Sequence, residues 1–142
     1  MGEKMPDQLK EKVQRIVSER GLYSCMNDTK WNKLRDAMRH EMPFQPPYIV
    51  KFLFDETAFV ETDFQNDVYH TMDWYDAYAM DGYFHAAVAI EWIKVRPRYL
   101  KSRGALLEPE VISAESEFVA ILKQYHIPFE ECNGVYCIYG YR

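Results

Sequence analysis

The stretch YFHAAVAIEWIKV, residues 83–95, carries the clearest alternation of apolar and polar side chains in the chain. Because successive side chains of a strand point to opposite faces, this alternation predicts a strand with one buried face. The side chains predicted to enter the core are Phe84, Ala86, Val88, Ile90 and Trp92. The opposite face, which carries Tyr83, His85 and Glu91, is predicted to meet solvent or a partner.

Two amphipathic helices are predicted in the first forty residues. Residues 7–20 place apolar side chains at helical spacing, and Gly21 stands where a left-handed residue commonly ends a helix. A second helix is predicted to begin after Asn27 and Asp28, which are favoured N-cap types, and to run to about residue 40. The apolar side chains that define the two helices are Leu9, Val13, Ile16, Val17, Trp31, Leu34 and Met38.

The middle of the chain is predicted to be mostly extended. Residues 48–54 (YIVKFLF) follow three prolines and are β-branched or aromatic in the main, and residues 68–74 alternate between larger apolar and polar side chains. A loop through Pro97 and Gly104 then leads to a third helix, which is predicted to begin at Ser113 as N-cap and to end near residue 126.

The tail IPFEECNGVYCIYGY, residues 127–141, predicts a hairpin, because Asn133-Gly134 is the strongest short turn signal. This turn pairs Glu130 with Cys137, and so divides the tail into two faces. The face predicted to be buried carries Ile127, Phe129 and Ile138. The other face carries His126, Cys137, Tyr139 and Tyr141.

These elements predict an α+β fold, in which helices pack on one face of a mostly antiparallel sheet of about five to six strands that ends in a C-terminal β-hairpin. The length of 142 residues and the 48% hydrophobic content are typical of one globular domain, residues 1–142, that needs no disulfide or metal to fold. Met1, Met5 and Met26 are all candidate translation starts. Residues 1–25, which contain the first predicted helix, are therefore expected to be an N-terminal extension of the domain.

The cysteine content and the hydropathy pattern indicate a cytoplasmic protein. Three cysteines are an odd number, and the charged N-terminal residues do not resemble a secretory leader, so free thiols are expected. The sequence has no run of about 20 apolar residues, so we expect no membrane span.

Charge is segregated along the middle of the chain. Between residues 52 and 93 there is no Lys or Arg, although the chain contains 17 of them. The acids of this acidic block are Asp55, Glu56, Glu61, Asp63, Asp67, Asp73, Asp76, Asp81 and Glu91. The ten residues that follow form a basic block, with Lys94, Arg96, Arg98, Lys101 and Arg103 and no acid.

The acidic block favours a protein-binding surface, because it interleaves carboxylates with aromatic side chains. Carboxylates attract a basic partner over long range, and aromatic side chains are common interface hot spots. We therefore expect a non-enzymatic binding module, immunity- or antitoxin-like, whose partner is a basic protein. The predicted partner-binding residues are Asp55, Glu56, Glu61, Asp63, Asp67, Asp73, Trp74, Tyr75 and Asp76.

Other interpretations remain open from the sequence. Charge blocks are often only solvated faces, and here the basic block would pair with the acids in the folded chain. Alternatively, the basic block is a phosphate-binding site for nucleic acid, although the net charge of −5 opposes this function. Exposed Tyr139 and Tyr141 are candidates for a homodimer contact.

A small metal-dependent hydrolase is the third functional alternative. The ligand-type residues of the region are His70, Asp73, Asp76, His85 and Glu91, but their spacing matches no zinc motif. Cys132 and Cys137 lack the second pair that a structural zinc site needs, and a nucleophilic Cys137 beside His126 lacks a third group to orient the base. We therefore expect no metal and no cofactor.

Three stretches of the sequence resemble a small family of uncharacterised bacterial proteins. They are MNDTKWNKL at residues 26–34, AIEWIKVRP at 89–97 and YHIPFEECNGVYCIYGY at 125–141. The resemblance covers about residues 26–142. It implies no activity and no site residues that transfer to this chain.

Overall fold

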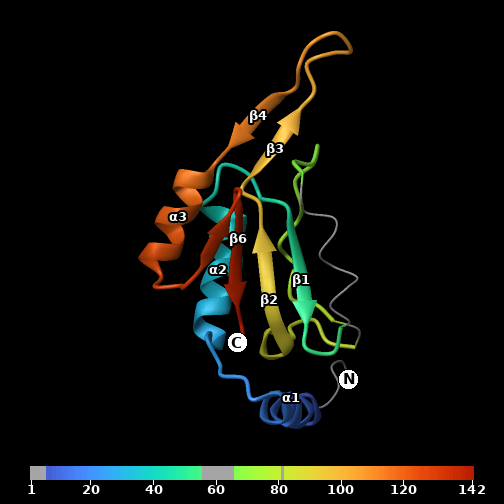
Figure 1. The fold of residues 1–142 in the computed structure, drawn as a ribbon, viewed down its shortest axis with the longest axis vertical. Helices are drawn as coiled ribbons and strands as arrows, with labels where there is room; N and C mark the ends of the chain where they lie inside the picture. Colours follow the sequence, from blue (N-terminus) through green and yellow to red (C-terminus); the bar gives the residue numbers. More distant parts are fainter. Residues whose placement is uncertain (1–5, 56–65, 81) are drawn as a thin grey trace.

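A computed structural model describes residues 6–55, 66–80 and 82–142 (Figure 1). In these residues the helices are α1 (Pro6–Arg20), α2 (Asp28–His40) and α3 (Glu115–Gln124), with a short 3-10 helix at Ala87–Ala89. The main sheet is antiparallel and has the order β1 (Tyr48–Phe52), β2 (Ile90–Val95), β6 (Val135–Tyr139) and β5 (Glu130–Cys132). A separate antiparallel pair is formed by β3 (Arg98–Lys101) and β4 (Glu110–Ser113). The predicted α+β class, the antiparallel sheet and the C-terminal hairpin are confirmed.

The helices α2 and α3 cover one face of the main sheet, and α2 lies behind it in Figure 1. The core between these layers contains Leu34 and Met38 from α2, Phe118 from α3, and Ile93 and Ile138 from the sheet. A second, smaller apolar cluster lies under α1, where Leu9 and Val13 pack with Leu53, Ala86 and Ala89. The opposite face of the sheet carries Lys94 and Tyr139 and is covered in part, because Lys51 and Trp92 on it are buried. We call it the open face.

A bulge at Glu91 decides which side chains of β2 enter the core. Lys51 pairs with Trp92 while the next residue, Phe52, pairs with Ile90, so Glu91 is an extra residue on β2. Ile90 and Ile93 therefore both reach the main core, and Trp92 turns to the open face. The predicted placement of Ile90 and Trp92 on one face was wrong, because strict alternation ends at a bulge.

Several predicted ends of elements are confirmed by their local contacts. The Asn27 side chain accepts a hydrogen bond from the Lys30 N–H and caps α2, and Gly21 takes a left-handed φ of 65° after α1. The terminal hairpin has the predicted register, with Glu130 opposite Cys137 and the turn at Asn133-Gly134. By contrast, α3 is capped by Ala114 rather than Ser113.

The predicted strand at residues 68–74 and the first half of the predicted strand at 83–95 are not strands in the structure. Residues 68–74 are irregular, because the Met72 and Trp74 N–H groups donate to the backbone and side-chain oxygens of Gln45 instead of a neighbouring strand. Residues 83–89 contain three small alanines, which favour strands weakly and let α1 approach this segment closely. Phe84, predicted to be buried, is exposed.

The predicted loop through Pro97 and Gly104 is instead an arm made of β3, β4 and their connection, residues 102–109. The arm extends away from the main sheet, and its connection lies at the end of the molecule opposite α1 (Figure 1). Within the described residues, no helix has both the length and the apolar composition that crossing a membrane requires.

Candidate functional site

The candidate site is a surface where the C-terminal half of α2 meets residues 71–80 and 82–84. Its centre is a pair of exposed rings, Tyr75 and Phe84, which are 52% and 45% exposed and whose centroids lie 5.2 Å apart. Arg39 lies 4.9 Å from the Tyr75 ring centroid, and Arg35 lies 5.9 Å from that of Phe84. These cation–π contacts hold the rings in place from the helix side. We call this set the aromatic surface.

A groove of about 560 Å³ adjoins the aromatic surface. Its walls are the residues that follow α2 and the residues that precede Trp74, with Met42 and Met72 as the flexible apolar side chains. Arg39 and Asp73 line it as well, so the groove reaches the base of the Tyr75 ring.

Gln45 holds the two walls of the groove together. Its backbone carbonyl accepts from the Met72 N–H at 3.2 Å, and its side-chain carbonyl accepts from the Trp74 N–H at 2.8 Å. Tyr48 adds a hydrogen bond from its hydroxyl to the Asp73 carbonyl at 3.2 Å. The groove is therefore preorganised, which lowers the entropy lost when a ligand binds.

This surface carries two carboxylates, Asp73 and Asp76, as well as the two arginines of α2. The side chains of Asp73 and Asp76 are exposed, and neither forms an ion pair with a described residue. Burial, together with the negative charges of Asp76 and Asp73, raises the pKa of Tyr48 to about 12. One Asp73 oxygen accepts from the Tyr75 N–H at 2.8 Å, which leaves the other available.

Trp74 was predicted as an interface anchor, and the structure places it in the core instead. Its side chain is fully buried, its Nε1–H donates to the Pro46 carbonyl at 2.8 Å, and its ring contacts Tyr48. The alternation of residues 68–74 predicted a strand with one apolar face. In the structure these residues are irregular, and only the Trp74 ring of this stretch is buried in the core. Tyr75, the next residue, occupies the exposed position.

The other predicted partner-binding acids lie apart from this surface. Asp55 is exposed beyond β1, where its side chain accepts from the Phe52 N–H at 2.9 Å. Asp67 is engaged by Arg98 and Arg96, as described below. Glu56, Glu61 and Asp63 lie outside the described residues.

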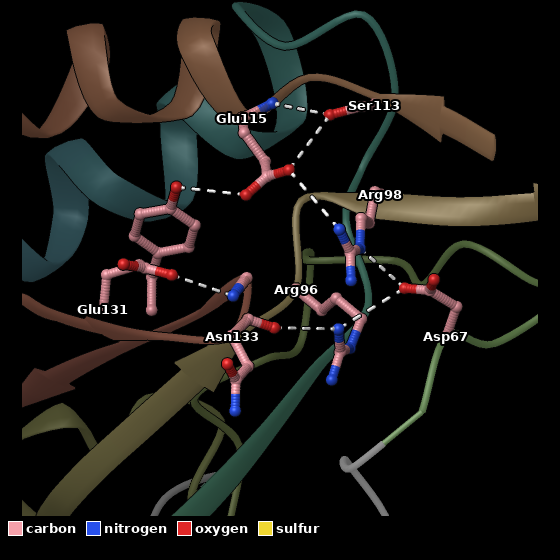
Figure 2. A network of polar contacts seen from close by, with 9 residues as sticks. Asp67, Arg96, Arg98, Ser113, Glu115, Glu131 and Asn133 are labelled. Carbon is pink, nitrogen blue, oxygen red and sulfur yellow. Dashed lines mark hydrogen bonds and ion pairs between the residues drawn. The ribbon is translucent and has the colours of Figure 1, made fainter.

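Two arginines of the basic block form a network with acids at the root of the arm (Figure 2). Arg98 donates through Nε to Asp67 at 2.7 Å and lies 3.7 Å from Glu115. The Arg96 side chain is only 2% exposed, and its Nη1 lies 3.4 Å from both Asp67 and the Asn133 carbonyl. Burial lowers the pKa of Arg96. We call these residues the root network.

The predicted phosphate site is therefore divided by the fold. Arg96 and Arg98 belong to the root network, and Lys94 lies 4.5 Å from the Trp92 ring centroid on the open face. Lys101 and Arg103 are exposed on the arm, where the Arg103 Nε donates to the Glu108 carbonyl at 2.8 Å. The basic block meets the acidic block at Asp67, as expected if charge blocks pair on folding.

A second cluster of charges lies at the bulge. The Lys51 side chain is 2% exposed, and its Nζ lies 2.6 Å from Glu91 Oε1. Arg20 at the end of α1 donates to both Glu91 oxygens, at 3.0 and 3.1 Å. Although burial alone would raise the Glu91 pKa, hydrogen bonds from Arg20 and Lys51 bring it below its ordinary value. We call these three residues the bulge cluster.

The open face of the sheet forms a hollow of about 950 Å³. Its apolar lining includes Ile49, Val135 and Tyr139, and Glu130 and Glu131 line it as well. Cys137 also lines the hollow, and burial raises the pKa of its thiol, opposite to the shift that activates a nucleophile. The thiols of the chain are all free, as expected from their odd number.

The ligand-type residues of the hydrolase alternative are separated. His85 lies 2.9 Å from the Asn32 side chain, His70 is exposed in a loop, and Glu91 belongs to the bulge cluster. Neither histidine is in a strand, so their predicted placement in a sheet was wrong. In the described part of the chain, no group of three or more such residues is positioned to hold a metal ion.

The groove walls after α2 were missed by the sequence reasoning. Pro43 lines the groove, and Pro46 and Pro47 follow it in the segment between α2 and β1, where the proline rings restrict the path of the backbone. A proline-rich segment between a helix and a strand was the available signal.

A model of a family of unknown function, DUF6678, matches residues 13–142. No curated protein and no solved structure matches the chain. The match begins within α1, earlier than residue 26, so the second half of α1 is part of the shared pattern. The resemblance to an uncharacterised family is confirmed.

Proposed function

Since this chain belongs to the DUF6678 family, whose function is unknown, we propose from its surface that it is a non-enzymatic protein-binding module. The observation that carries the proposal is the aromatic surface beside the preorganised groove. Tyr75 and Phe84 offer large, rigid ring faces to solvent, and rings of this kind lose little side-chain entropy on binding.

The partner is a protein with basic side chains near an apolar segment. The segment would occupy the groove between Met42 and Met72, and its cations would reach Asp73 and Asp76 at the edge. The net charge of −5 adds long-range attraction to the same partner. An immunity- or antitoxin-like role, with a basic effector as partner, fits this chemistry. The free thiols suit a reducing compartment such as the cytoplasm.

Capture of a partner from an extract of the source cells tests the proposal. Wild-type protein is compared with a Tyr75→Ala/Phe84→Ala variant, and Tyr23→Ala, which removes a more exposed ring elsewhere, is the control. We expect the double variant to lose a basic partner by at least roughly 30-fold in affinity and the control to keep it. Equal capture by all three proteins would exclude the aromatic surface.

Neutralising Asp73 and Asp76 distinguishes long-range electrostatic attraction, which sets the association rate, from direct contacts, which set the dissociation rate. An Asp73→Asn/Asp76→Asn variant should associate more slowly and lose most of the salt dependence of the association rate, while dissociation changes less. Binding that is insensitive to both salt and this variant would contradict a basic partner. Nucleic acid recovered instead, and lost when Lys101 and Arg103 are neutralised, would favour the phosphate-binding alternative.

A further inference from the structure

The arm presents apolar side chains to solvent at its far end. Leu106 and Leu107, in the connection between β3 and β4, are 98% and 61% exposed, and Val111 on β4 is exposed as well. The connection lies far from the main sheet (Figure 1). An exposed leucine pair on a protrusion is the type of feature that enters a pocket of another molecule.

The arm is held firmly at its root, so its tip is presented in a defined position. Arg98 contacts Asp67 and Glu115, and the Leu100 N–H donates to the Val68 carbonyl at 2.7 Å. The Tyr99 ring meets the Phe44 ring edge to face at 4.9 Å. A preordered arm loses less entropy on docking than a loose loop would.

The charges beside the tip indicate a protein as the partner. Lys101 and Arg103 stand on one side of the leucine pair and Glu108 and Glu110 on the other, so the tip region is neutral overall. A neutral tip gains little attraction from an anionic lipid surface or from nucleic acid. It matches a surface that has an apolar centre and charged edges.

The hollow on the open face of this same chain is such a surface. Ile49, Val135 and Tyr139 supply apolar lining, and its volume of about 950 Å³ accommodates two leucine side chains. Glu130 and Glu131 line it together with Lys94 and Arg96, so the hollow carries both signs of charge, as the tip region does. Glu130 pairs with Arg142 at 2.7 Å. Glu131 forms no ion pair with a described residue and accepts a hydrogen bond from the Gly134 N–H at 2.9 Å, so it is the acid that Lys101 or Arg103 of a second copy would meet.

The position of the hollow makes the contact reciprocal. Arg96 lines the hollow, and β3 begins two residues later at Arg98, so the arm starts where the hollow ends. The paired strands β3 and β4 carry the tip away from the hollow of its own chain (Figure 1). A two-fold axis that places one arm on the open face of a second copy places the second arm on the first copy in the same way, which is an isologous arrangement.

We propose that this protein forms a homodimer in which the leucine pair at the tip of each arm enters the hollow on the open face of the other copy. The contact uses the face that carries Tyr139 and the arm that carries Lys101 and Arg103. The aromatic surface around Tyr75 is not part of this contact. The dimer and the partner-binding function can therefore be tested independently of each other.

Sedimentation velocity of the full chain over a wide concentration range tests the dimer. We expect wild type to dimerise and Leu106→Asp/Leu107→Asp to raise the dimer dissociation constant at least tenfold, with an unchanged circular dichroism spectrum because the tip is exposed. Phe54→Asp, which adds a matched charge on an exposed ring beyond β1, should leave the dimer intact. A monomeric wild type at every concentration, or a dimer unaffected by the tip variant, would overturn the proposal.

A mixing experiment identifies the hollow as the receptor for the tip. Val135→Asp places a charge in the hollow and leaves the arm unchanged. The tip variant places charges at the end of the arm and leaves the hollow unchanged. Each variant alone should be monomeric, and an equimolar mixture should recover part of the dimer, because one arm and one hollow remain compatible. No recovery on mixing would exclude arm exchange.

A milder variant and a lipid probe complete the test. Glu130→Gln/Glu131→Gln keeps the oxygen that accepts the hydrogen bond from Gly134. This variant should weaken the dimer about threefold and reduce the salt dependence of dimerisation.

Flotation with vesicles of phosphatidylcholine and phosphatidylserine tests whether the leucine tip binds a lipid surface instead of a second copy of the chain. Binding to vesicles by a monomer, abolished by the tip variant, would replace the dimer with a lipid contact.

Discussion

Strand β2 has the bulge cluster at one end and the root network at the other, and each end buries one cation against a carboxylate. At the bulge, the compact ammonium of Lys51 is met by Glu91 and by the Phe52 carbonyl at 3.4 Å. At the root, the forked guanidinium of Arg96 reaches Asp67 and the Asn133 carbonyl. A point charge needs one strong partner, whereas a fork joins several segments at once.

The two ends also differ in why β6 needs a glycine there. A Cβ on Gly140 would lie 2.0 Å from the Ile90 carbonyl oxygen, which is backbone and cannot move aside. A Cβ on Gly134 would lie 3.1 Å from the end of the flexible Arg98 side chain, but Gly134 has a φ of 79°. Gly140 is thus required for space and Gly134 for backbone conformation.

The largest effect is expected from Gly140→Ala. The added methyl group forces β6 away from the bulge and breaks the hydrogen bonds that Gly140 and Tyr141 donate to the Glu91 carbonyl. The free energy of unfolding should fall by at least about 4 kcal/mol, or the chain should fail to fold. Urea denaturation followed by Trp fluorescence measures it. A loss below about 1 kcal/mol would show that the bulge end is not rigid.

Glu91→Ala should come next, with a loss of about 3 kcal/mol, because it leaves a buried ammonium without its carboxylate. Arg20 would also lose its partner, so amide hydrogen exchange in α1 should rise. The control is Lys51→Met/Glu91→Leu, which removes both charges and should remain much closer to wild type in urea denaturation. If the double variant is equally unstable, packing rather than charge explains the loss.

Asp67→Ala should cost less, about 2 kcal/mol, although it too removes the acid beside a buried cation. Arg96 keeps the Asn133 carbonyl and Arg98 keeps Glu115, so neither guanidinium loses all its contacts. Thermal unfolding measures the difference, and Asp55→Ala, an exposed acid, is the control. A loss larger than that of Glu91→Ala would contradict the argument that a fork shares its partners.

Gly134→Ala should cost about 1 kcal/mol, since alanine tolerates a left-handed φ poorly and Arg98 can move. Gly134→Asn is the matched variant, because asparagine accepts this conformation better, and it should recover part of the loss. Equal losses for Gly134→Ala and Gly140→Ala in urea denaturation would remove the distinction between the two ends.

The smallest effect is expected in the pH dependence of stability. The Glu91 pKa is lowered from its ordinary 4.5 in the folded state, so its ionised form stabilises the fold above that value, and this contribution is lost as pH falls through the folded pKa. Wild type should therefore lose more stability than Glu91→Gln between pH 7 and pH 3 in urea denaturation. Parallel curves for the two proteins would show that Glu91 does not contribute.

Much of the fold could be predicted because its signals are local. Asn27 announces the start of α2, Gly21 the end of α1, and Asn133-Gly134 a hairpin in its exact register. Caps and tight turns depend on a few neighbouring residues, so the local sequence is enough to predict them. The α+β class followed from the order of these elements.

The candidate site was only half visible from the sequence. Asp73, Tyr75 and Asp76 were expected at a surface and are exposed, but Trp74 between them is buried. Its indole fits the core because Gln45 and Pro46, far away in sequence, supply the partners for its polar groups. A residue's exposure in an irregular segment depends on such distant contacts, and periodicity does not report them.

The sequence by itself determined the helix ends, the hairpin turn and the separation of acids from cations, because each depends on neighbouring residues. Only the tertiary structure decided that Glu91 forms a bulge, that Arg96 is buried against Asp67, and that residues 98–113 form an arm. These outcomes require groups distant in sequence to share one desolvated position, where an unpaired charge or backbone group costs more free energy than any local preference supplies.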